Sequence, residues 1–375
     1  MEYYDRFYGW FKKFSKLLMY NSIIMITSAI NQTPNIVIIG SGWATKSFTN
    51  MIDKDKYNVK IVSNSDHFIY TPQLANFSVT KDVKDIETDM THIPKIEFIN
   101  DTIKDVDFDK QILITEKDNI KYDYVIFAHG AQTNTFNIPG VKENCLFLKT
   151  KNDAELIHKH LEGLEPNSNV AVIGCGLTGS ELIGCLLDKK KFNITAIDGL
   201  SGPLQMFNKS NINKTLDLWR TNNINMIFNS FVKNIEPSTI YFKDNKVEYD
   251  LAIWCGGVKI SPLSQLINKK LNLESRRGIL VNPYLQFQKN AFAIGDCADA
   301  GVFPTAQNAT QQGRYLAQRF NNKFRDDQKY HYQDKGKLCY IGEKNSILEN
   351  KFISLHGKIG YLTGTIIHYF NKRFN

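Results

Sequence analysis

The chain has 375 residues, of which 42% are hydrophobic, so it can build two or three domains with a sizeable core. Its net charge of +8 comes from 46 basic and 38 acidic residues, and no tight Lys/Arg cluster stands out. Composition and charge therefore exclude a disordered chain and argue against nucleic acid as a partner.

The cysteines are scattered along the chain. No two of them have CxxC or CxxxxC spacing, so the sequence predicts no metal site and no local redox disulfide. We expect the cysteines to be small core residues of a protein that resides in a reducing compartment. The six are Cys145, Cys175, Cys185, Cys255, Cys297 and Cys339.

Residues 1–33 differ in character from the rest of the chain. Lys12, Lys13 and Lys16 precede a fairly apolar stretch, residues 17–30, which is too short to span a bilayer. This pattern predicts a targeting segment or an amphipathic membrane arm, and leaves open whether it is cleaved.

A nucleotide-binding pattern begins at residue 35. Asn35–Ile39 predicts a short buried strand, and a glycine-rich turn, a helix to about Asp53 and the strand Val59–Val62 follow it. Thr45 stands where a third glycine is usual, so we expect helix and strand to lie slightly apart there. Ser63 follows the second strand, and no carboxylate stands there to bind a ribose. The turn consists of Gly40, Ser41, Gly42, Trp43, Ala44 and Thr45.

The same pattern returns 134 residues later. Asn169–Ile173 predicts a strand, Ser180–Leu187 a helix, and Asn193–Asp198 the next strand. The turn is complete here, with Gly174, Gly176 and Gly179 around Cys175, Leu177 and Thr178. Two dinucleotide-binding units in one chain are far more specific than one.

Each unit is followed by strand-like runs that the sequence predicts to be hairpins. The first pairs Ile112–Thr115 with Tyr122–Phe127, and the second pairs Ile240–Phe242 with Leu251–Trp254.

Two acidic residues sharpen the prediction of the ligands. Asp198 lies 24 residues after Gly174 at a strand end, where a carboxylate accepts hydrogen bonds from an adenosine ribose and repels a 2′-phosphate, which favours NADH over NADPH. Asp296 follows a small-residue strand and Gly295, and beside a flavin it can bind a ribitol hydroxyl. A solvated turn is the alternative for either residue.

These motifs, in this order, resemble the type II NADH:quinone oxidoreductases, the single-subunit NADH dehydrogenases that pump no protons. The resemblance covers roughly residues 35–348. It rests on the two glycine turns, on residues 68–72 and 137–144, and above all on residues 304–313 (PTAQNATQQG) and 332–342 (YQDKGKLCYIG).

The resemblance implies an α/β fold with two Rossmann-like domains, the FAD domain being discontinuous and the NADH domain inserted in it. The expected boundaries are 34–150 and 276–330 for the FAD domain, 151–275 for the NADH domain, and 331–375 for a C-terminal membrane-association segment. The implied cofactors are FAD and NADH.

The resemblance also assigns site residues. Thr71, Pro72, Ala306 and Gln307 are expected near the flavin ring, with Ala128 and Gly130 at a strand end of the same domain. Glu181 matches a family glutamate near the nicotinamide. Gln307 and Gln311 are expected to line a quinone pocket; their i, i+4 spacing puts both on one face of a helix from about Ala306 to Asn321, so a plain polar helix face is the alternative.

The C-terminus carries a membrane signal of its own. Residues 359–370 (IGYLTGTIIHYF) are apolar and aromatic and are flanked by Lys358, Lys372 and Arg373, a pattern typical of a helix lying on a membrane surface. An ordinary packed helix is the alternative. We expect a peripheral membrane protein at the mitochondrial inner membrane or a cytoplasmic membrane face. A homodimer is an open alternative to a monomer.

Two departures from the family pattern and several rival functions stay open. His129 stands where the family often has a smaller residue, and the 33 residues after Gly342 are fewer than is usual, which bears on the membrane segment and the dimer contact. Thr45 and His129 together leave a decayed, non-enzymatic flavin site as an alternative. A disulfide reductase would need a redox cysteine pair, which is missing. Sulfide:quinone oxidoreductase and ferredoxin- or apoptosis-factor-like NADH reductases share the fold.

Overall fold

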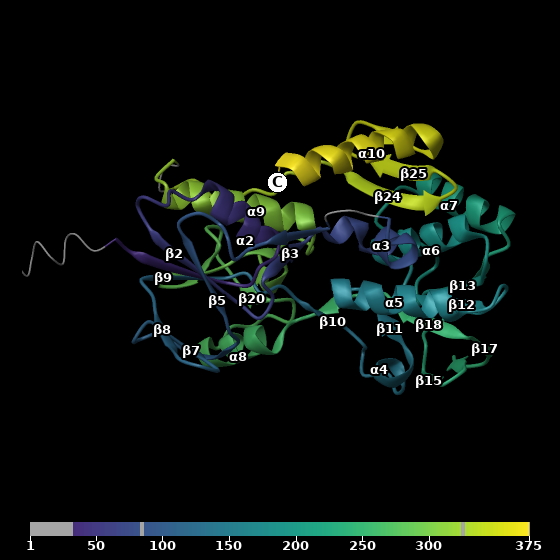
Figure 1. Ribbon diagram of the computed structural model, residues 1–375, viewed down its shortest axis with the longest axis horizontal. Helices are drawn as coiled ribbons and strands as arrows, with labels where there is room; N and C mark the ends of the chain where they lie inside the picture. The colour runs from purple at the N-terminus through teal and green to yellow at the C-terminus, as the bar shows by residue number, and fades with distance from the viewer. Residues whose placement is uncertain (1–32, 83–85, 324–326, 375) are drawn as a thin grey trace, which may run out of the picture.

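A computed structural model of the chain describes residues 33–82, 86–323 and 327–374. All but the last residue of the expected N-terminal arm, 1–33, therefore lies outside the described residues. Two α/β units lie side by side, and the C-terminal helix α10 (Gly357–Phe374) lies along the top of the second unit and ends beside the first (Figure 1).

The first α/β unit is built on a six-stranded sheet of order β21-β22-β9-β1-β2-β5, parallel except where β21 pairs with β22. Its central strands are buried apolar runs, as strands covered on both faces must be. The strands are β1 (Asn35–Ile39), β2 (Asn58–Ser63), β5 (Ile96–Asn100), β9 (Tyr124–Phe127), β21 (Gln286–Gln288) and β22 (Ala291–Ala293).

Two different layers cover this sheet. Helices α2 (Trp43–Met51) and α9 (Ala306–Phe320) pack on one face through Phe48, Leu316 and Phe320. The other face is covered by α8 (Pro262–Leu271) and by the three-stranded sheet of β6 (Ile103–Asp107), β7 (Ile112–Thr115) and β8 (Asn119–Lys121).

The second α/β unit has a five-stranded, fully parallel sheet of order β11-β18-β12-β13-β14. The strands are β11 (Leu146–Phe147), β12 (Asn169–Ile173), β13 (Asn193–Ile197), β14 (Asn225–Ile227) and β18 (Leu251–Trp254). One face packs on α3 (Leu74–Thr80), α5 (Lys151–Gly163), α6 (Leu177–Lys189) and α7 (Lys209–Thr221). The other packs on α4 (Val141–Asn144) and on β15 (Asn234–Glu236), β16 (Thr239–Tyr241) and β17 (Lys246–Glu248).

Helix α3 belongs by sequence to the first unit but packs its apolar face on α5 and α6 of the second. Short strands complete the scaffold: β3 (His67–Ile69) pairs with β4 (Glu87–Asp89), β10 (Gln132–Thr133) with β19 (Val258–Lys259), and β20 (Ile279–Leu280) with β23 (Ala298–Asp299). Two 3₁₀ turns, η1 (Thr71–Gln73) and η2 (Gly295–Cys297), follow β3 and β22.

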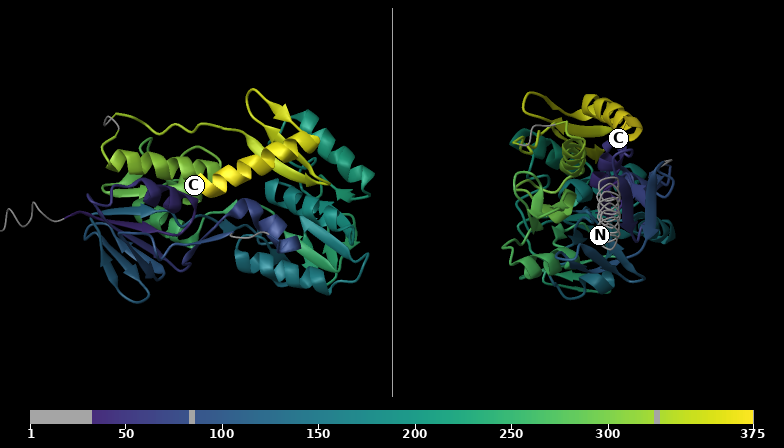
Figure 2. Two further views of the ribbon diagram at one scale, coloured as in Figure 1. Left: turned by 45° about the horizontal axis from the view of Figure 1, so that its top comes forward. Right: turned by 90° about the vertical axis from the view of Figure 1, so that its left-hand side faces the viewer.

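The C-terminal segment forms a small antiparallel sheet and one long helix. Strands β24 (Lys337–Gly342), β25 (Asn345–Glu349) and β26 (Ser354–Leu355) precede α10. Helix α10 packs closely on this sheet, because a Cβ at Gly360 would lie 2.2 Å from the Ser346 carbonyl oxygen. Figure 2 shows α10 running from this sheet toward the end of α9.

Both predicted hairpins are wrong, because the two strands of each form but pair with other strands. Strand β7 pairs with β6 and β8, while β9 leaves it and joins the first sheet between β1 and β22. In the second unit β16 pairs with β15 and β17, and β18 joins the parallel sheet. The reason is burial: β9 and β18 are apolar enough to be covered on both faces, which a two-stranded hairpin cannot provide.

The contact between α2 and α9 generates the first prediction. A Cβ at Gly313 would lie 2.3 Å from the Ala44 carbonyl oxygen, which is backbone and cannot move aside alone. Gly313→Ala should therefore lower the free energy of unfolding by about 1–3 kcal/mol, measured by thermal or urea unfolding, despite the better helix propensity of alanine.

The matched control is Gly163→Ala, which also lies in a helix but has nothing within 4 Å of the added Cβ. It should be neutral or slightly stabilising. Equal effects of the two substitutions would contradict the close contact.

Candidate functional site

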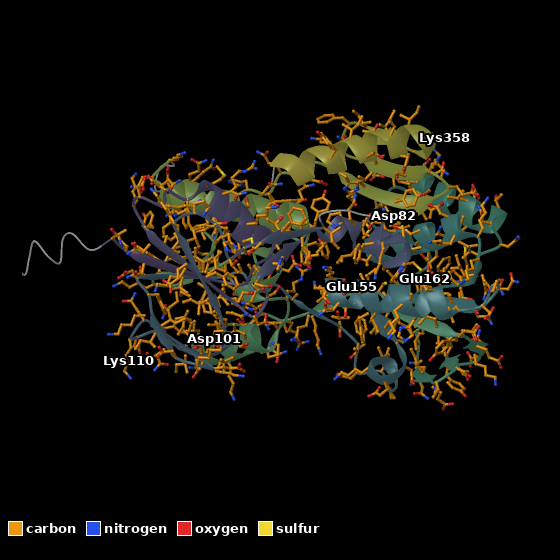
Figure 3. The ribbon with its side chains drawn as sticks, viewed as in Figure 1. Asp82, Asp101, Lys110, Glu155, Glu162 and Lys358 are labelled. Atoms are coloured by element: carbon orange, nitrogen blue, oxygen red, sulfur yellow. The ribbon has the colours of Figure 1, made fainter. Side chains whose placement is uncertain are left out.

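The first cavity lies in the first α/β unit, has a volume of about 680 Å³, and is bordered by the carboxyl ends of β1, β2 and β9. Ligands in open α/β sheets bind at these strand ends. Among the predicted flavin residues, those that line the cavity are Gly40, Ser41, Gly42, Trp43, Ala44, Ser63, Thr71, Ala128, Gly130, Asp296 and Ala306. Asp101, labelled in Figure 3, also lines it and was not predicted.

The first glycine turn leaves room for a phosphate. Gly40 has φ +105°, and a Cβ there would lie 2.6 Å from the Ala128 carbonyl oxygen, so only glycine fits. Helix α2 begins after Gly42 without a side-chain cap and without an acidic residue in its first turn. Its free N–H groups and its dipole can hold a pyrophosphate.

Thr45 occupies the third-glycine position without harm. Its side chain is fully buried, and its hydroxyl donates a 2.8 Å hydrogen bond to the Gly40 carbonyl. At the matching position of the second turn a Cβ on Gly179 would lie 1.8 Å from the Gly174 carbonyl oxygen. The first turn is therefore the wider one, in accord with the sequence expectation.

Asp296 reaches the same cavity from turn η2. It is half-buried, burial raises the pKa of its carboxyl while Lys149 opposes that rise, and among the described residues no donor bonds it. A half-buried carboxylate without a protein donor can accept a hydrogen bond from a ligand hydroxyl. A ribitol hydroxyl suits this position, so the residues fit FAD.

The second glycine turn lies between β12 and α6. Gly174 has φ +96°, and a Cβ on it would lie 2.8 Å from the Cys255 carbonyl oxygen. Asp198 accepts hydrogen bonds from the N–H groups of Cys175 (2.7 Å) and Leu200 (2.8 Å). The carboxylate thus braces the turn and stands beside the free N-terminus of α6, as a dinucleotide site requires.

A second cavity of about 600 Å³ adjoins the first, and residues of α10 line part of it. Its walls include Pro72, Leu177, Gln307, Gln311 and His368. The two cavities share five lining residues, Trp43, Thr71, Thr178, Glu181 and Ala306. A ring bound at this junction faces both cavities.

The two predicted amides line the second cavity but already have protein partners. Gln307 accepts hydrogen bonds from the Tyr332 hydroxyl (2.9 Å) and the Lys335 N–H (2.8 Å) and donates to the Gly336 carbonyl (3.1 Å). Gln311 bonds both backbone groups of Gln333, at 2.8 and 2.9 Å. Both amides therefore hold the segment 332–336 against α9.

Glu181 lies on α6 at the junction of the cavities. Burial raises the pKa of its carboxyl to about 8, and a backbone hydrogen bond from Tyr340 opposes that rise only in part. The raised pKa favours the protonated carboxyl at neutral pH, the form that can donate a hydrogen bond to a bound ring.

The cysteines are confirmed as unpaired, largely buried residues. Burial raises the pKa of every one, to about 12 for Cys145, Cys255 and Cys297 and well above its ordinary value for Cys175, Cys185 and Cys339. A reactive cysteine needs a lowered pKa, so thiol–disulfide chemistry has no candidate here. Within the described residues no group of His, Cys, Asp and Glu could hold a metal ion.

His129 is accommodated beside the first cavity. Its Nε2 lies 2.8 Å from the Ser261 hydroxyl and 2.9 Å from that of Ser264, and burial lowers its pKa to about 4. The ring is therefore neutral and held in place, and it does not block the cavity that it borders.

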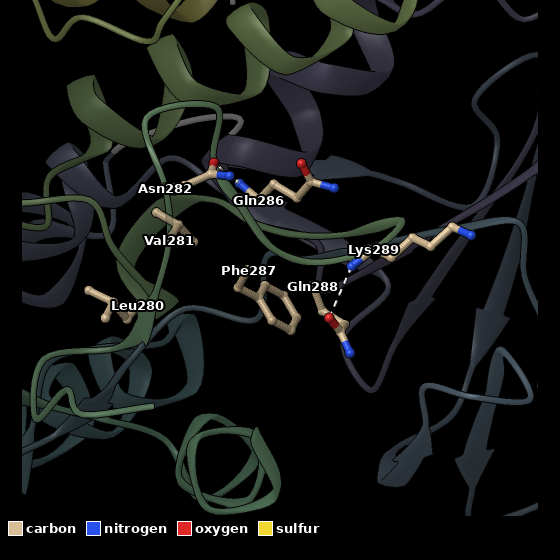
Figure 4. A pocket seen from close by; sticks show the side chains of 7 residues that line it. All are labelled: Leu280, Val281, Asn282, Gln286, Phe287, Gln288 and Lys289. Atoms are coloured by element: carbon tan, nitrogen blue, oxygen red, sulfur yellow. Dashed lines mark hydrogen bonds between the residues drawn. The ribbon is translucent and has the colours of Figure 1, made fainter. Parts of the chain in front are cut away.

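A third cavity, of about 480 Å³, lies away from both glycine turns, and Figure 4 shows the residues around it. It runs along one stretch of chain, residues 280–289, and Lys289 is its one charged residue. The site chemistry lies elsewhere.

Several residues that line these cavities were not predicted as site residues. Tyr70 and His368 line the second cavity together, although 298 positions separate them, and Lys149 lines the first. No spacing connects Tyr70 with His368; the sequence signals were the place of Tyr70 in the motif 68–72 and a His within an apolar helix.

Comparison with known proteins agrees with this geometry. The family model described as pyridine nucleotide-disulphide oxidoreductase matches residues 34–313. A probable mitochondrial NADH-ubiquinone oxidoreductase of Schizosaccharomyces pombe is 31% identical over 76% of this chain and 62% of its own length. An external mitochondrial NADH-ubiquinone oxidoreductase of Saccharomyces cerevisiae is 29% identical over 84% of this chain and 72% of its own.

Solved structures agree on the fold. NDH2 of Plasmodium falciparum in complex with NADH has a TM-score of 0.83 at 23% identity, covering 90% of this chain and 94% of that one. The sulfide:quinone oxidoreductase of Aquifex aeolicus reaches 0.77 at 21% identity, covering 90% of each chain. The predicted pair of Rossmann-like units is confirmed, while the fold alone does not choose between these two activities.

The buried carboxyl of Glu181 gives a pH prediction. The folded chain keeps this proton up to about pH 8, whereas the unfolded chain releases it near the ordinary value of 4.5. The stabilisation linked to that proton is complete below pH 4.5 and is lost as the pH rises toward 8.

Wild-type stability should therefore fall with rising pH more steeply than that of Glu181→Gln, by at most about 1.4 kcal/mol per pH unit. Unfolding of both purified proteins at pH 5, 6.5 and 8 measures this difference. A difference that stays constant with pH would show that the carboxyl titrates normally.

Proposed function

The chain belongs to the pyridine nucleotide-disulphide oxidoreductase family, and from that membership we propose that it oxidises NADH with FAD and reduces a membrane quinone, without pumping protons. The observation that carries this proposal is the meeting of two cavities at Trp43, Thr71, Thr178, Glu181 and Ala306. One cavity has the lining that FAD needs, and the other gives a second substrate access to the same ring.

FAD, when bound, supplies the two-electron chemistry between nucleotide and quinone. The chain would bind and orient it: the α2 N-terminus would hold the pyrophosphate, Asp296 would hold the ribitol, and the residues shared by the two cavities would lie beside the ring. Trp43 is itself fixed there, because its indole N–H donates a 3.0 Å hydrogen bond to the Thr71 hydroxyl.

NADH is the proposed donor. Gly174, Gly176 and Gly179 allow a pyrophosphate to approach the N-terminus of α6, and Asp198 presents a carboxylate to the ribose. The same carboxylate would repel the 2′-phosphate of NADPH. Leu177 and Thr178 lead from this turn into the second cavity, toward Glu181.

A quinone is the proposed acceptor. The wall of the second cavity combines apolar side chains such as Pro72, Leu338 and Ile367 with a few polar ones, a lining typical of sites for ring-shaped apolar ligands. We assign Gln307 and Gln311 to this site because they hold its wall, the segment 332–336.

The relatives support quinone over other acceptors. The names of the Schizosaccharomyces pombe and Saccharomyces cerevisiae relatives specify ubiquinone. This chain spans 62% of the length of the Schizosaccharomyces pombe relative, so the acceptor stays a proposal here. Sulfide oxidation is disfavoured because burial raises the pKa of every cysteine. A ferredoxin-like protein acceptor is a possible outcome of the acceptor assay.

Helix α10 is the proposed membrane-binding element. No helix among the described residues is long and apolar enough to cross a membrane. The side chains of Ile359, Leu362 and Ile366 are 68%, 63% and 48% exposed on α10. Lys358 lies at the outer end of this helix (Figure 3), and such a face suits an interfacial helix.

We therefore infer a peripheral membrane protein. The names of the relatives favour a mitochondrial membrane over a cytoplasmic membrane face, and a homodimer stays a prediction.

An acceptor assay tests the proposed function. The purified protein should carry bound FAD, and NADH should bleach the flavin absorbance. With NADH as donor, the protein should reduce a short-chain quinone faster than it reduces oxygen or a ferredoxin. It should also reduce the quinone faster with NADH than with sulfide as donor. A flavin that NADH reduces but quinone does not reoxidise would remove the quinone assignment.

Gln311→Ala tests the assigned wall. Losing two hydrogen bonds to Gln333 should loosen the segment 332–336 and slow quinone reduction about tenfold, with less effect on flavin reduction by NADH. Stopped-flow measurement of each half-reaction separates the two. Equal loss in both would contradict the assigned pocket.

The combined substitution of Ile359, Leu362 and Ile366 by glutamine tests the membrane face. Removing this exposed apolar surface should weaken binding to anionic liposomes more than about tenfold in a flotation assay. Activity with a water-soluble quinone should persist, since none of the three lines the cavity. If the variant floats with the liposomes as well as the wild type does after a high-salt wash, this face does not bind the membrane.

A further inference from the structure

We propose that His368 of α10 donates a hydrogen bond to a carbonyl oxygen of the quinone, and that Tyr70 fixes the ring nitrogen from which it donates. This inference rests on the proposed function and deepens it. It assigns to the C-terminal helix a residue that contacts substrate, in addition to the apolar face proposed for the membrane.

The geometry joins two segments that are remote in sequence. The Tyr70 hydroxyl lies 3.1 Å from Nδ1 of His368, and the two rings stand edge to face with centroids 6.1 Å apart. Tyr70 is only 4% exposed and contacts Trp43, with ring centroids 5.3 Å apart. Both Tyr70 and His368 line the second cavity.

We assign to His368 the tautomer in which Nδ1 accepts. Burial and the nearby Glu181 carboxyl raise the pKa of Tyr70 to about 12, so the phenol keeps a proton that it can donate. Burial lowers the pKa of His368, which favours the neutral ring. With the phenol donating to Nδ1 across the 3.1 Å contact, Nε2 carries the N–H.

That N–H has no described acceptor and is one of several donors that face the cavity, with Glu181, Arg314 and Lys335, while other polar groups of the wall are engaged. The amides of Gln307 and Gln311 bond the segment 332–336, and Lys337 donates to the Met206 carbonyl. The Thr310 hydroxyl donates to the Ala306 carbonyl. A quinone head group offers carbonyl oxygens, which need donors, and His368 supplies one from the α10 side of the cavity.

Two isosteric substitutions separate the ring nitrogens. In His368→Gln the amide nitrogen reaches the position of Nε2 and keeps the donor, whereas the shorter side chain of His368→Asn reaches only the position of Nδ1. With a short-chain quinone in detergent-free buffer, we expect His368→Gln to keep kcat/KM within about threefold, and His368→Asn to lose about tenfold.

Tyr70→Phe should lose about threefold, since the ring then samples both tautomers. Flavin reduction by NADH and turnover with ferricyanide should stay unchanged in all three variants. His160→Gln, at an exposed position on α5, controls for a general effect of losing a histidine.

The outcomes separate this inference from the proposed function. If the wild type reduces quinone but His368→Gln and His368→Asn have the same kcat/KM, His368 makes no donor contact. If His368→Asn slows ferricyanide turnover as much as quinone turnover, its role is structural. If the wild type accepts electrons from NADH but never reduces quinone, the proposed function fails first.

Discussion

The close packing of α2 on α9 is the constraint on which the site depends. Gly313 lets the backbone of α9 come so near α2 that a Cβ would meet the Ala44 carbonyl oxygen at 2.3 Å. Helix α2 starts at the first glycine turn, and α9 starts with Ala306 and Gln307. One glycine contact therefore sets the distance between the phosphate end of the first cavity and the wall of the second.

The C-terminal segment completes this arrangement from the other side. Helix α10 is anchored on β25 at Gly360, and at its far end it reaches Tyr70 of the first unit. The second cavity is thus closed by parts of the chain that lie far apart in sequence: η1, α6, α9 and α10. Such a cavity exists only once both units and the C-terminal helix have assembled.

Sequence patterns predicted most of the local structure and part of the site. Glycine turns are detectable because a positive φ and a close backbone approach exclude other residues, and Asp198 and Asp296 were singled out by their places at strand ends. The partner strands of β7 and β9 were not detectable, since pairing is decided by which strand can be covered on both faces. The same holds for Tyr70 and His368, which tertiary packing alone brings together.

The amides of Gln307 and Gln311 show a subtler limit. Their i, i+4 spacing predicted a shared face of a helix, and both side chains lie on α9 beside the second cavity, but their bonds to the segment 332–336 depend on how that segment folds back. Sequence spacing can place a polar group on a surface, whereas the partner of that group is a property of the assembled molecule.

The burial of the thiols has a consequence for the durability of the molecule. Peroxide and alkylating reagents attack thiolates, and all six cysteines are held as protonated, largely inaccessible thiols. The chain presents such reagents with almost no sulfur nucleophile, so we expect oxidative inactivation to start at other side chains, such as the methionines.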